Sequence, residues 1–167
     1  MNFGTKRLMF KDTGDHHRTT LRLLIPQLIA VLGVWYTVSN DMNWYEGLKN
    51  PFFNPPEWFF GPVWIGLYGL MGIASYLVWK ETSPWYSRTM TWFWTQLAVG
   101  ALWALVFFEL HSPLLGFILI VPLWILVVIC MFAFSLRSKV ASALLLPYFV
   151  WVSFGVTLNA SIYCFNR

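Results

Sequence analysis

Charged residues are scarce in this chain of 167 residues, and their scarcity excludes a soluble fold. Only 11% of the residues are Asp, Glu, Lys or Arg, whereas 58% are hydrophobic and the mean hydropathy is +0.60. A typical soluble domain has about 25% charged residues. Intrinsic disorder is excluded as well, because disordered chains are rich in charge and poor in aromatic residues. The composition therefore predicts an integral membrane protein with a single domain.

Groups that carry familiar chemistry are also scarce. The two cysteines, Cys130 and Cys164, are too few for a disulfide framework. The sequence contains no HExxH motif, Cys–His cluster or Ser–His–Asp set. No charged residue lies deep within an apolar run, where a proton-coupled carrier would place ionisable groups. We therefore predict no catalytic residue, no metal site and no nucleic-acid partner.

Five long apolar runs are present, and each is long enough to cross the hydrocarbon layer as a helix. The runs are continuous rather than alternating, which favours helices over a β-barrel. The predicted fold is all-α, an integral membrane bundle of five transmembrane helices. A basic, polar tail over residues 1–21 precedes the membrane domain over residues 22–165. The predicted spans cover residues 22–39, 58–79, 90–110, 113–135 and 141–163.

Lys and Arg are unevenly divided between the two sides of this bundle. Nine of the 11 lie on the side of the N-terminus, and only Lys49 and Arg167 lie on the other. Because positively charged loops stay in the cytoplasm, we expect the N-terminus there in a bacterial membrane, or in the equivalent compartment of an organelle.

The segment from residue 40 to residue 62, which runs from the end of the first predicted span into the start of the second, combines prolines with many aromatic residues. Prolines disfavour a long helix and stiffen an extended chain. We expect the segment to fold back as a lid over the helix ends, because stiffness lowers the entropy cost of placing its rings. An interfacial belt of aromatic rings is the alternative. The prolines are Pro51, Pro55, Pro56 and Pro62, and the proposed lid residues are Trp44 and Trp58.

Three spans carry aromatic and polar residues at helical spacing, so that each set shares one helix face. If the three faces converge, they enclose an aromatic pocket that suits a large, flat, apolar ligand. Ordinary helix packing explains the same pattern equally well. The three sets are Trp64, Tyr68 and Met71, then Gln96, Gly100, Trp103 and Phe107, and finally Tyr148, Trp151, Gly155 and Asn159.

Short motifs in the loop and spans resemble those of one known family. The loop contains Trp44-Tyr45, Leu48-Lys49, Pro51-Phe52, Asn54-Pro55-Pro56 and Trp58, followed by Pro62-Val63-Trp64, Leu67-Tyr68 and Met71-Gly72. Further along are Gln96-Leu97, Leu102-Trp103, Phe107-Phe108, Pro147-Tyr148, Trp151 and Leu158-Asn159. From about residue 24 to about residue 164, the sequence resembles the tryptophan-rich sensory protein / translocator protein family (TspO/MBR, the peripheral benzodiazepine receptor).

This resemblance implies a five-helix bundle, often a homodimer, whose ligand cavity opens toward the first long loop. It implies binding of a tetrapyrrole such as protoporphyrin IX or haem, with no cofactor required, and of cholesterol in animals. Some members are thought to degrade protoporphyrin in light. In a eukaryote the location would be the mitochondrial outer membrane. With Gln96 added from its helix face, the implied ligand residues are Tyr45, Pro55, Trp64, Tyr68, Gln96, Trp103, Phe107, Trp151, Gly155 and Asn159.

Two departures from the family pattern affect the expected ligand. Gly100 stands where the family usually has Asn, so Gln96 remains as the polar group one turn away. Ala160 replaces the family's aromatic residue after Asn159, which leaves cholesterol a weakly supported partner. The predicted function is a receptor or sensor that binds tetrapyrroles and moves or regulates them. The alternatives are a light-dependent protoporphyrin-degrading enzyme and a passive transporter of tetrapyrrole or sterol.

Overall fold

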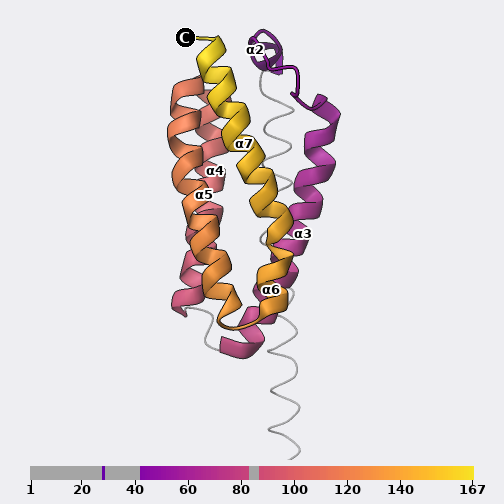
Figure 1. The fold of residues 1–167 in the computed structure, drawn as a ribbon, viewed down its shortest axis with the longest axis vertical. Coiled ribbons are helices and arrows are strands. Elements are labelled where there is room, and N and C mark those ends of the chain that lie inside the picture. Colours follow the sequence, from indigo (N-terminus) through magenta and orange to yellow (C-terminus); the bar gives the residue numbers. More distant parts are fainter. Residues whose placement is uncertain (1–27, 29–41, 83–86) are drawn as a thin grey trace, which may run out of the picture.

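The computed structural model describes Leu28, residues 42–82 and residues 87–167, and these residues form helices with no strand. The tail over residues 1–21 and the predicted span over residues 22–39 lie outside the described residues, apart from Leu28. Four long helices run lengthwise, and α2 lies at the end where the chain terminates (Figure 1). The helices are α2 (Met42–Glu46), α3 (Glu57–Thr82), α4 (Arg88–Glu109), α5 (Pro113–Ser135), α6 (Lys139–Leu144) and α7 (Leu146–Phe165).

Four segments among the described residues are long and apolar enough to cross a membrane. They correspond to the second, third, fourth and fifth predicted spans. The chain is therefore a multi-pass helical membrane bundle, as its composition predicts. The segments are Trp58–Lys80, Arg88–Glu109, Pro113–Ser135 and Lys139–Phe165.

The last of these segments contains a break at Leu145 that separates α6 from α7. Pro147 follows, and it has no N–H to donate to the carbonyl one turn earlier. The Leu145 N–H bonds instead to the Ser142 carbonyl at 3.1 Å in a tighter turn. Pro147 then lies in the first turn of α7, where a missing N–H costs nothing. The segment still has the length of one span.

Pro62 lies inside α3, so the loop before this helix ends earlier than the prolines suggest. The Phe59 N–H bonds to the Pro56 carbonyl at 2.9 Å, which begins the helical turn. Pro62 removes only one hydrogen bond close to the start of α3. Spanning helices tolerate such a proline because neighbouring groups satisfy the freed carbonyl. Pro62 therefore belongs to the second predicted span and not to the loop, so only the end of the predicted loop segment at residue 62 is wrong.

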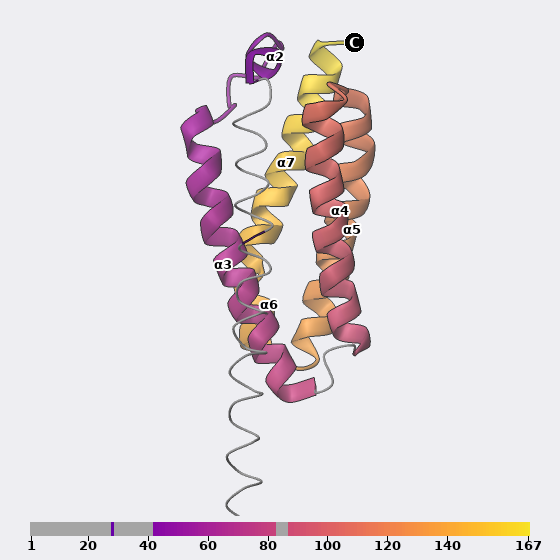
Figure 2. The same ribbon diagram turned by 180° about the vertical axis from the view of Figure 1, so that it is seen from behind.

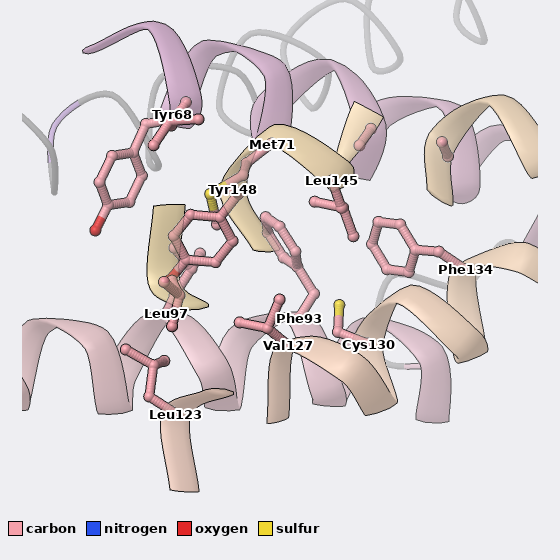
Figure 3. Packing of buried hydrophobic residues seen from close by; sticks show 14 of the residues in the cluster. Tyr68, Met71, Phe93, Leu97, Leu123, Val127, Cys130, Phe134, Leu145 and Tyr148 are labelled. Atoms are coloured by element: carbon pink, nitrogen blue, oxygen red, sulfur yellow. The ribbon is translucent and has the colours of Figure 1, made fainter. Parts of the chain in front are cut away.

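The main core joins all the long helices, and Tyr148 of α7 lies in its middle (Figure 3). Around its ring are Met71 of α3, Leu97 of α4 and Val127 of α5, all of them buried. In this core α5 packs along both α4 and α7, whereas α3 packs chiefly against α6. Toward the end that carries α2, α3 diverges from α7 (Figures 1 and 2). Large side chains are therefore needed to bridge α3 and α7 there.

Candidate functional site

Four aromatic residues meet where α3 faces α7, and we call them the α3–α7 aromatic group. The centre of the Trp64 ring lies 5.5 Å from that of Tyr68, 6.3 Å from that of Tyr148 and 6.5 Å from that of Trp151. Spacings of four residues on α3 and three on α7 put each pair on one helix face. Tyr68 and Tyr148 are buried, whereas Trp64 and Trp151 are half-buried. Both indoles therefore keep part of their surface uncovered by the described residues.

The first turn of α3 extends this group toward the loop. The Phe59 and Phe60 rings lie 6.1 Å and 5.8 Å from the Trp151 ring. Phe154, one turn further along α7, lies 5.6 Å from Trp151 and 6.1 Å from Phe53 of the loop. Aromatic contacts therefore run without interruption from the α3–α7 aromatic group into the loop.

A second set of rings joins α2 to the end of α4, and we call it the loop–α4 aromatic group. Trp103 and Phe107 stack at 5.6 Å with an angle of 16° between their planes. From α2, Trp44 and Tyr45 pack against Phe107 at 5.6 Å and 6.2 Å. Tyr45 and Phe107 are only 5% and 2% exposed. The loop is therefore packed onto the helix end through buried side chains rather than lying free in solvent.

The short link between α4 and α5 supplies a further contact with α2. His111 has a backbone φ of 48°, a left-handed conformation that His adopts more readily than most residues. Its ring lies 4.7 Å from the ring of Trp44. The turn therefore directs an imidazole toward the same indole that packs on Phe107.

Asn159 is the polar centre of the contact between α4 and α7. Trp103 Nε1 donates to Asn159 Oδ1 at 3.4 Å, and Asn159 Nδ2 donates to the Gly155 carbonyl at 3.0 Å. Asn159 is 3% exposed, so both bonds are sheltered. Gly116 of α5 permits this packing, because a Cβ there would collide with the Phe107 ring and lie 3.0 Å from Asn159 Oδ1.

Gln96 differs from Asn159 because its side-chain oxygen has no hydrogen-bond partner among the described residues. It is 1% exposed, and its Oε1 atom accepts no hydrogen bond from any residue that the structure describes. One turn further along α4, a Cβ on Gly100 would meet the Tyr148 hydroxyl oxygen at 3.7 Å. Leaving a buried acceptor without a donor is costly. Gln96 is therefore a hydrogen-bond acceptor that a ligand or water could use.

The loop that follows α2 is folded on itself by hydrogen bonds. Tyr45 Oη donates to Asn54 Oδ1 at 2.8 Å, which joins its beginning to its end. The Asn54 N–H also bonds to the Pro51 carbonyl at 3.0 Å, which closes a turn. Asn50 Nδ2 donates to the Tyr45 carbonyl at 3.3 Å. The prolines and these bonds together give the loop a defined shape beside the helix ends.

The sequence model of the TspO/MBR family matches residues 22–164. The chain belongs to the TspO/MBR family. It is 42% identical over 148 residues to the tryptophan-rich protein TspO of Archaeoglobus fulgidus, which covers 86% of this chain and 96% of the relative. The resemblance predicted from the loop and span motifs is therefore confirmed.

Relatives come from animals as well as from prokaryotes. The translocator protein of Homo sapiens is 34% identical over 149 residues, with 86% of this chain and 85% of the relative covered. The tryptophan-rich sensory protein of Cereibacter sphaeroides is 31% identical over 116 residues, which is 70% of this chain and 72% of that protein.

Within this TspO/MBR protein, the predicted ligand residues fall into the two aromatic groups. Trp64, Tyr68 and Trp151 lie in the α3–α7 aromatic group, whereas Tyr45, Trp103 and Phe107 lie in the loop–α4 aromatic group with Asn159 beside them. Tyr148 and Asn159 lie at the two ends of one face of α7, which links the groups.

The remaining predicted residues lie at the margins of these groups. A Cβ on Gly155 would lie 3.0 Å from Ile120 Cδ1, so this glycine adjoins α5. Pro55 is half-buried within the loop. Of the two proposed lid residues, Trp44 is packed between Phe107 and His111, whereas Trp58 is 73% exposed and lies beside Phe59. Trp58 belongs to the first turn of α3 rather than to the loop, so of the two proposed lid residues only Trp44 packs across onto the end of another helix.

Sequence reasoning missed residues whose role depends on tertiary contacts. Gly116 is essential to the contact between Phe107 and Asn159, and its only signal is a small residue within an apolar span. Asn54 and Asn166 bind the loop through their side chains. Neither belongs to a helix face, so periodicity could not have identified them.

Proposed function

We propose that this TspO/MBR protein is a membrane receptor or sensor that binds porphyrins and related tetrapyrroles and moves or regulates them. The observation that carries the proposal is that residues on one face of α7 contact both aromatic groups. Trp151 on this face meets Trp64 of α3, and Asn159 two turns later bonds to Trp103 of α4. The names of two relatives, a sensory protein and a translocator protein, are consistent with this function.

The chemistry of the site suits a flat aromatic macrocycle. Ring faces attract one another in offset or edge-to-face arrangements worth about 0.5–1.5 kcal/mol per pair beyond the burial of apolar area. Trp64 and Trp151 are both half-buried and 88° apart in plane, so each could meet a different part of a large ligand. Gln96 Oε1 adds one buried acceptor that no described residue pairs with. Protoporphyrin IX, haem or another tetrapyrrole is the proposed ligand class.

Binding can be measured through the protein's own tryptophan fluorescence. Protoporphyrin IX should quench the emission of the full chain in lipid nanodiscs, and a double variant Trp64→Ala/Trp151→Ala should bind at least tenfold more weakly. Trp79→Ala is the matched control, because Trp79 lies near the far end of α3 beside Tyr76. Equal affinity in the double variant and the control would exclude the proposed site.

A light-dependent reaction of the bound porphyrin is the second candidate, and the arrangement of the indoles favours it. Trp64 contacts Trp151 and two tyrosines, so an oxidised indole would have electron donors beside it. The bound porphyrin would absorb the light and an indole would supply the electron. Under illumination in air, loss of porphyrin absorbance should slow in the Trp64→Phe/Trp151→Phe variant. An unchanged rate would exclude a tryptophan-dependent reaction.

Passive passage of a tetrapyrrole or sterol is the third candidate. The described spans carry no charged residue in their middle, which disfavours ion coupling but allows movement of an apolar ligand. Flux of protoporphyrin or cholesterol across sealed vesicles, compared with empty vesicles, separates transport from sensing.

We further propose five spans, with residues 22–39 as the first, and an N-terminus in the cytoplasm. The apolar run over these residues has the length of a span, and the family match begins at residue 22. Four basic residues cluster at the end of the bundle away from α2, which is the cytoplasmic end in this arrangement. They are Lys80, Arg88, Arg137 and Lys139. Because Cys164 is exposed near Arg167, the test uses Cys130→Ser/Cys164→Ser with a single cysteine introduced at Arg167. A membrane-impermeant reagent should modify it in intact cells, and protection from the reagent would refute this orientation.

The chain is also proposed to form a homodimer in a lipid bilayer. The support is the resemblance of the sequence to the family. Native mass spectrometry of the purified protein should show twice the mass of one chain, 19.5 kDa. A single-chain mass throughout would refute the dimer.

A further inference from the structure

The side chain of Asn166, just beyond α7, binds the backbone of Lys49 in the loop through both of its polar atoms. The Lys49 N–H donates to Asn166 Oδ1 at 3.0 Å, and Asn166 Nδ2 donates to the Lys49 carbonyl at 3.2 Å. The same Nδ2 donates to the Ile162 carbonyl at 2.8 Å, which fixes the amide on the last turn of α7. One side chain therefore fastens the loop to a helix 117 residues away in the sequence.

Lys49 is exposed, but it lies in the loop between apolar contacts, since its neighbour Leu48 packs against the cluster around Tyr45 and Phe107 and Pro51 is buried. At the start of the loop, Tyr45 is buried against Phe107 of α4. After Lys49, Phe52 is fully exposed, and Phe53 reaches Phe154 of α7 at 6.1 Å. Asn166 therefore adds a polar attachment between the apolar contacts that hold the loop on either side of Lys49.

The hydrogen bonds between Asn166 and Lys49 can break and form again. The bonds between Asn166 and Lys49 are exposed, so water competes for both groups and each bond contributes only modestly. The buried contact between Tyr45 and Phe107 would survive when these bonds break. The loop could then pivot about α2, with Asn166 as the releasable attachment.

We propose that Asn166 is a positioning residue that holds the loop against α7 and sets how often the loop opens. Given the tetrapyrrole site proposed above, on which this consequence rests, loop opening controls how fast the ligand enters and leaves. Such a residue changes the rates of association and dissociation together and leaves the affinity nearly constant.

Amide hydrogen exchange of the full chain in lipid nanodiscs tests the attachment without any ligand. In Asn166→Ala, the amides of residues 47–54 should exchange roughly tenfold faster, since two weak hydrogen bonds no longer oppose opening. Asn166→Asp keeps an oxygen for the Lys49 N–H but loses both donated bonds, so it should be intermediate. Arg167→Ala, at the exposed neighbouring residue, is the matched control and should exchange like the wild type.

Stopped-flow mixing with protoporphyrin IX tests the consequence for exchange of the ligand. Asn166→Ala should accelerate quenching on binding and recovery on dissociation by similar factors, with the dissociation constant changed by less than about twofold. A weaker affinity with unchanged exchange of the loop amides would make Asn166 a ligand contact and overturn the proposal. Unchanged amide exchange in Asn166→Ala would overturn it directly.

The two proposals fail in different ways. If protoporphyrin IX does not quench the wild-type protein, the proposed tetrapyrrole function fails, whereas the amide-exchange result still decides whether Asn166 holds the loop. If protoporphyrin binds but Asn166→Ala behaves like Arg167→Ala in both measurements, the ligand site stands and the role of Asn166 is refuted.

Discussion

Trp103 of α4 and Asn159 of α7 are joined by a sheltered hydrogen bond, from the indole N–H to Oδ1 at 3.4 Å. The amide group of Asn159 is at the same time tied to its own helix through the Gly155 carbonyl. The bond therefore orients the Trp103 ring, which in turn stacks on Phe107 beneath α2. Packing of the loop thus depends on a polar contact between two spans.

Replacing Asn159 with Leu should destabilise the fold by about 1–3 kcal/mol, because the indole N–H of Trp103 then stays buried without an acceptor. The free energy of unfolding in mixed micelles of increasing dodecyl sulfate content measures this loss. The double variant Trp103→Phe/Asn159→Leu removes both partners and should lose less than the sum of the single variants. Strict additivity would mean that the two side chains do not interact.

Gly116→Ala should destabilise the protein by about 1–3 kcal/mol, because the new methyl group overlaps the Phe107 ring and crowds Asn159. Gly100→Ala is the matched control, since its methyl group would meet only ordinary contacts, with the closest at 3.7 Å. That substitution should be neutral or stabilise α4 by up to about 1 kcal/mol. Equal unfolding free energies for the two variants would refute the close approach at Gly116.

Tyr45→Phe should loosen the loop without destabilising the bundle. It removes the hydroxyl that bonds to Asn54 Oδ1 at 2.8 Å, while the ring can still pack on Phe107. The net loss is about 1 kcal/mol and local, so amide exchange near Asn54 should rise while the unfolding midpoint stays constant. Tyr163→Phe, at a ring stacked on Phe117 of α5, supplies the control. Loop exchange that matches this control would contradict the bond.

Gln96→Leu should weaken ligand binding while leaving the free energy of unfolding nearly unchanged. The oxygen of Gln96 is buried without a partner in the described part of the chain, so losing it should change the unfolding free energy by less than about 1 kcal/mol. The affinity for protoporphyrin IX should fall several-fold if the ligand donates to this oxygen. A strong loss of stability with unchanged affinity would assign Gln96 to packing.

The spans could be predicted because continuous apolar runs end where charges, prolines and serines begin. The predicted span over residues 113–135 coincides with α5, whose start is fixed by the Ser112 cap and Pro113. The break at Leu145 follows from a single proline inside an otherwise uniform run, which hydropathy alone does not register. The ends of the helices thus depend on individual caps and prolines, which the length of an apolar run does not reveal.

The candidate site could be predicted only in part, because periodicity assigns residues to a face without naming the opposite helix. Helical spacing placed Trp64 and Tyr68 on one helix face, but only the fold shows that Trp151 meets Trp64 while Asn159 meets Trp103. The attachment of Lys49 by Asn166 joins residues at opposite ends of the described chain. No local pattern in the sequence records such a contact.

The most direct test of the central claim is a structure of the full chain in lipid with protoporphyrin IX bound. We expect the macrocycle to contact Trp64 or Trp151 of the α3–α7 aromatic group. A macrocycle seated instead on the outward face of α5, where Ile118, Ile125 and Phe132 are exposed, would contradict it.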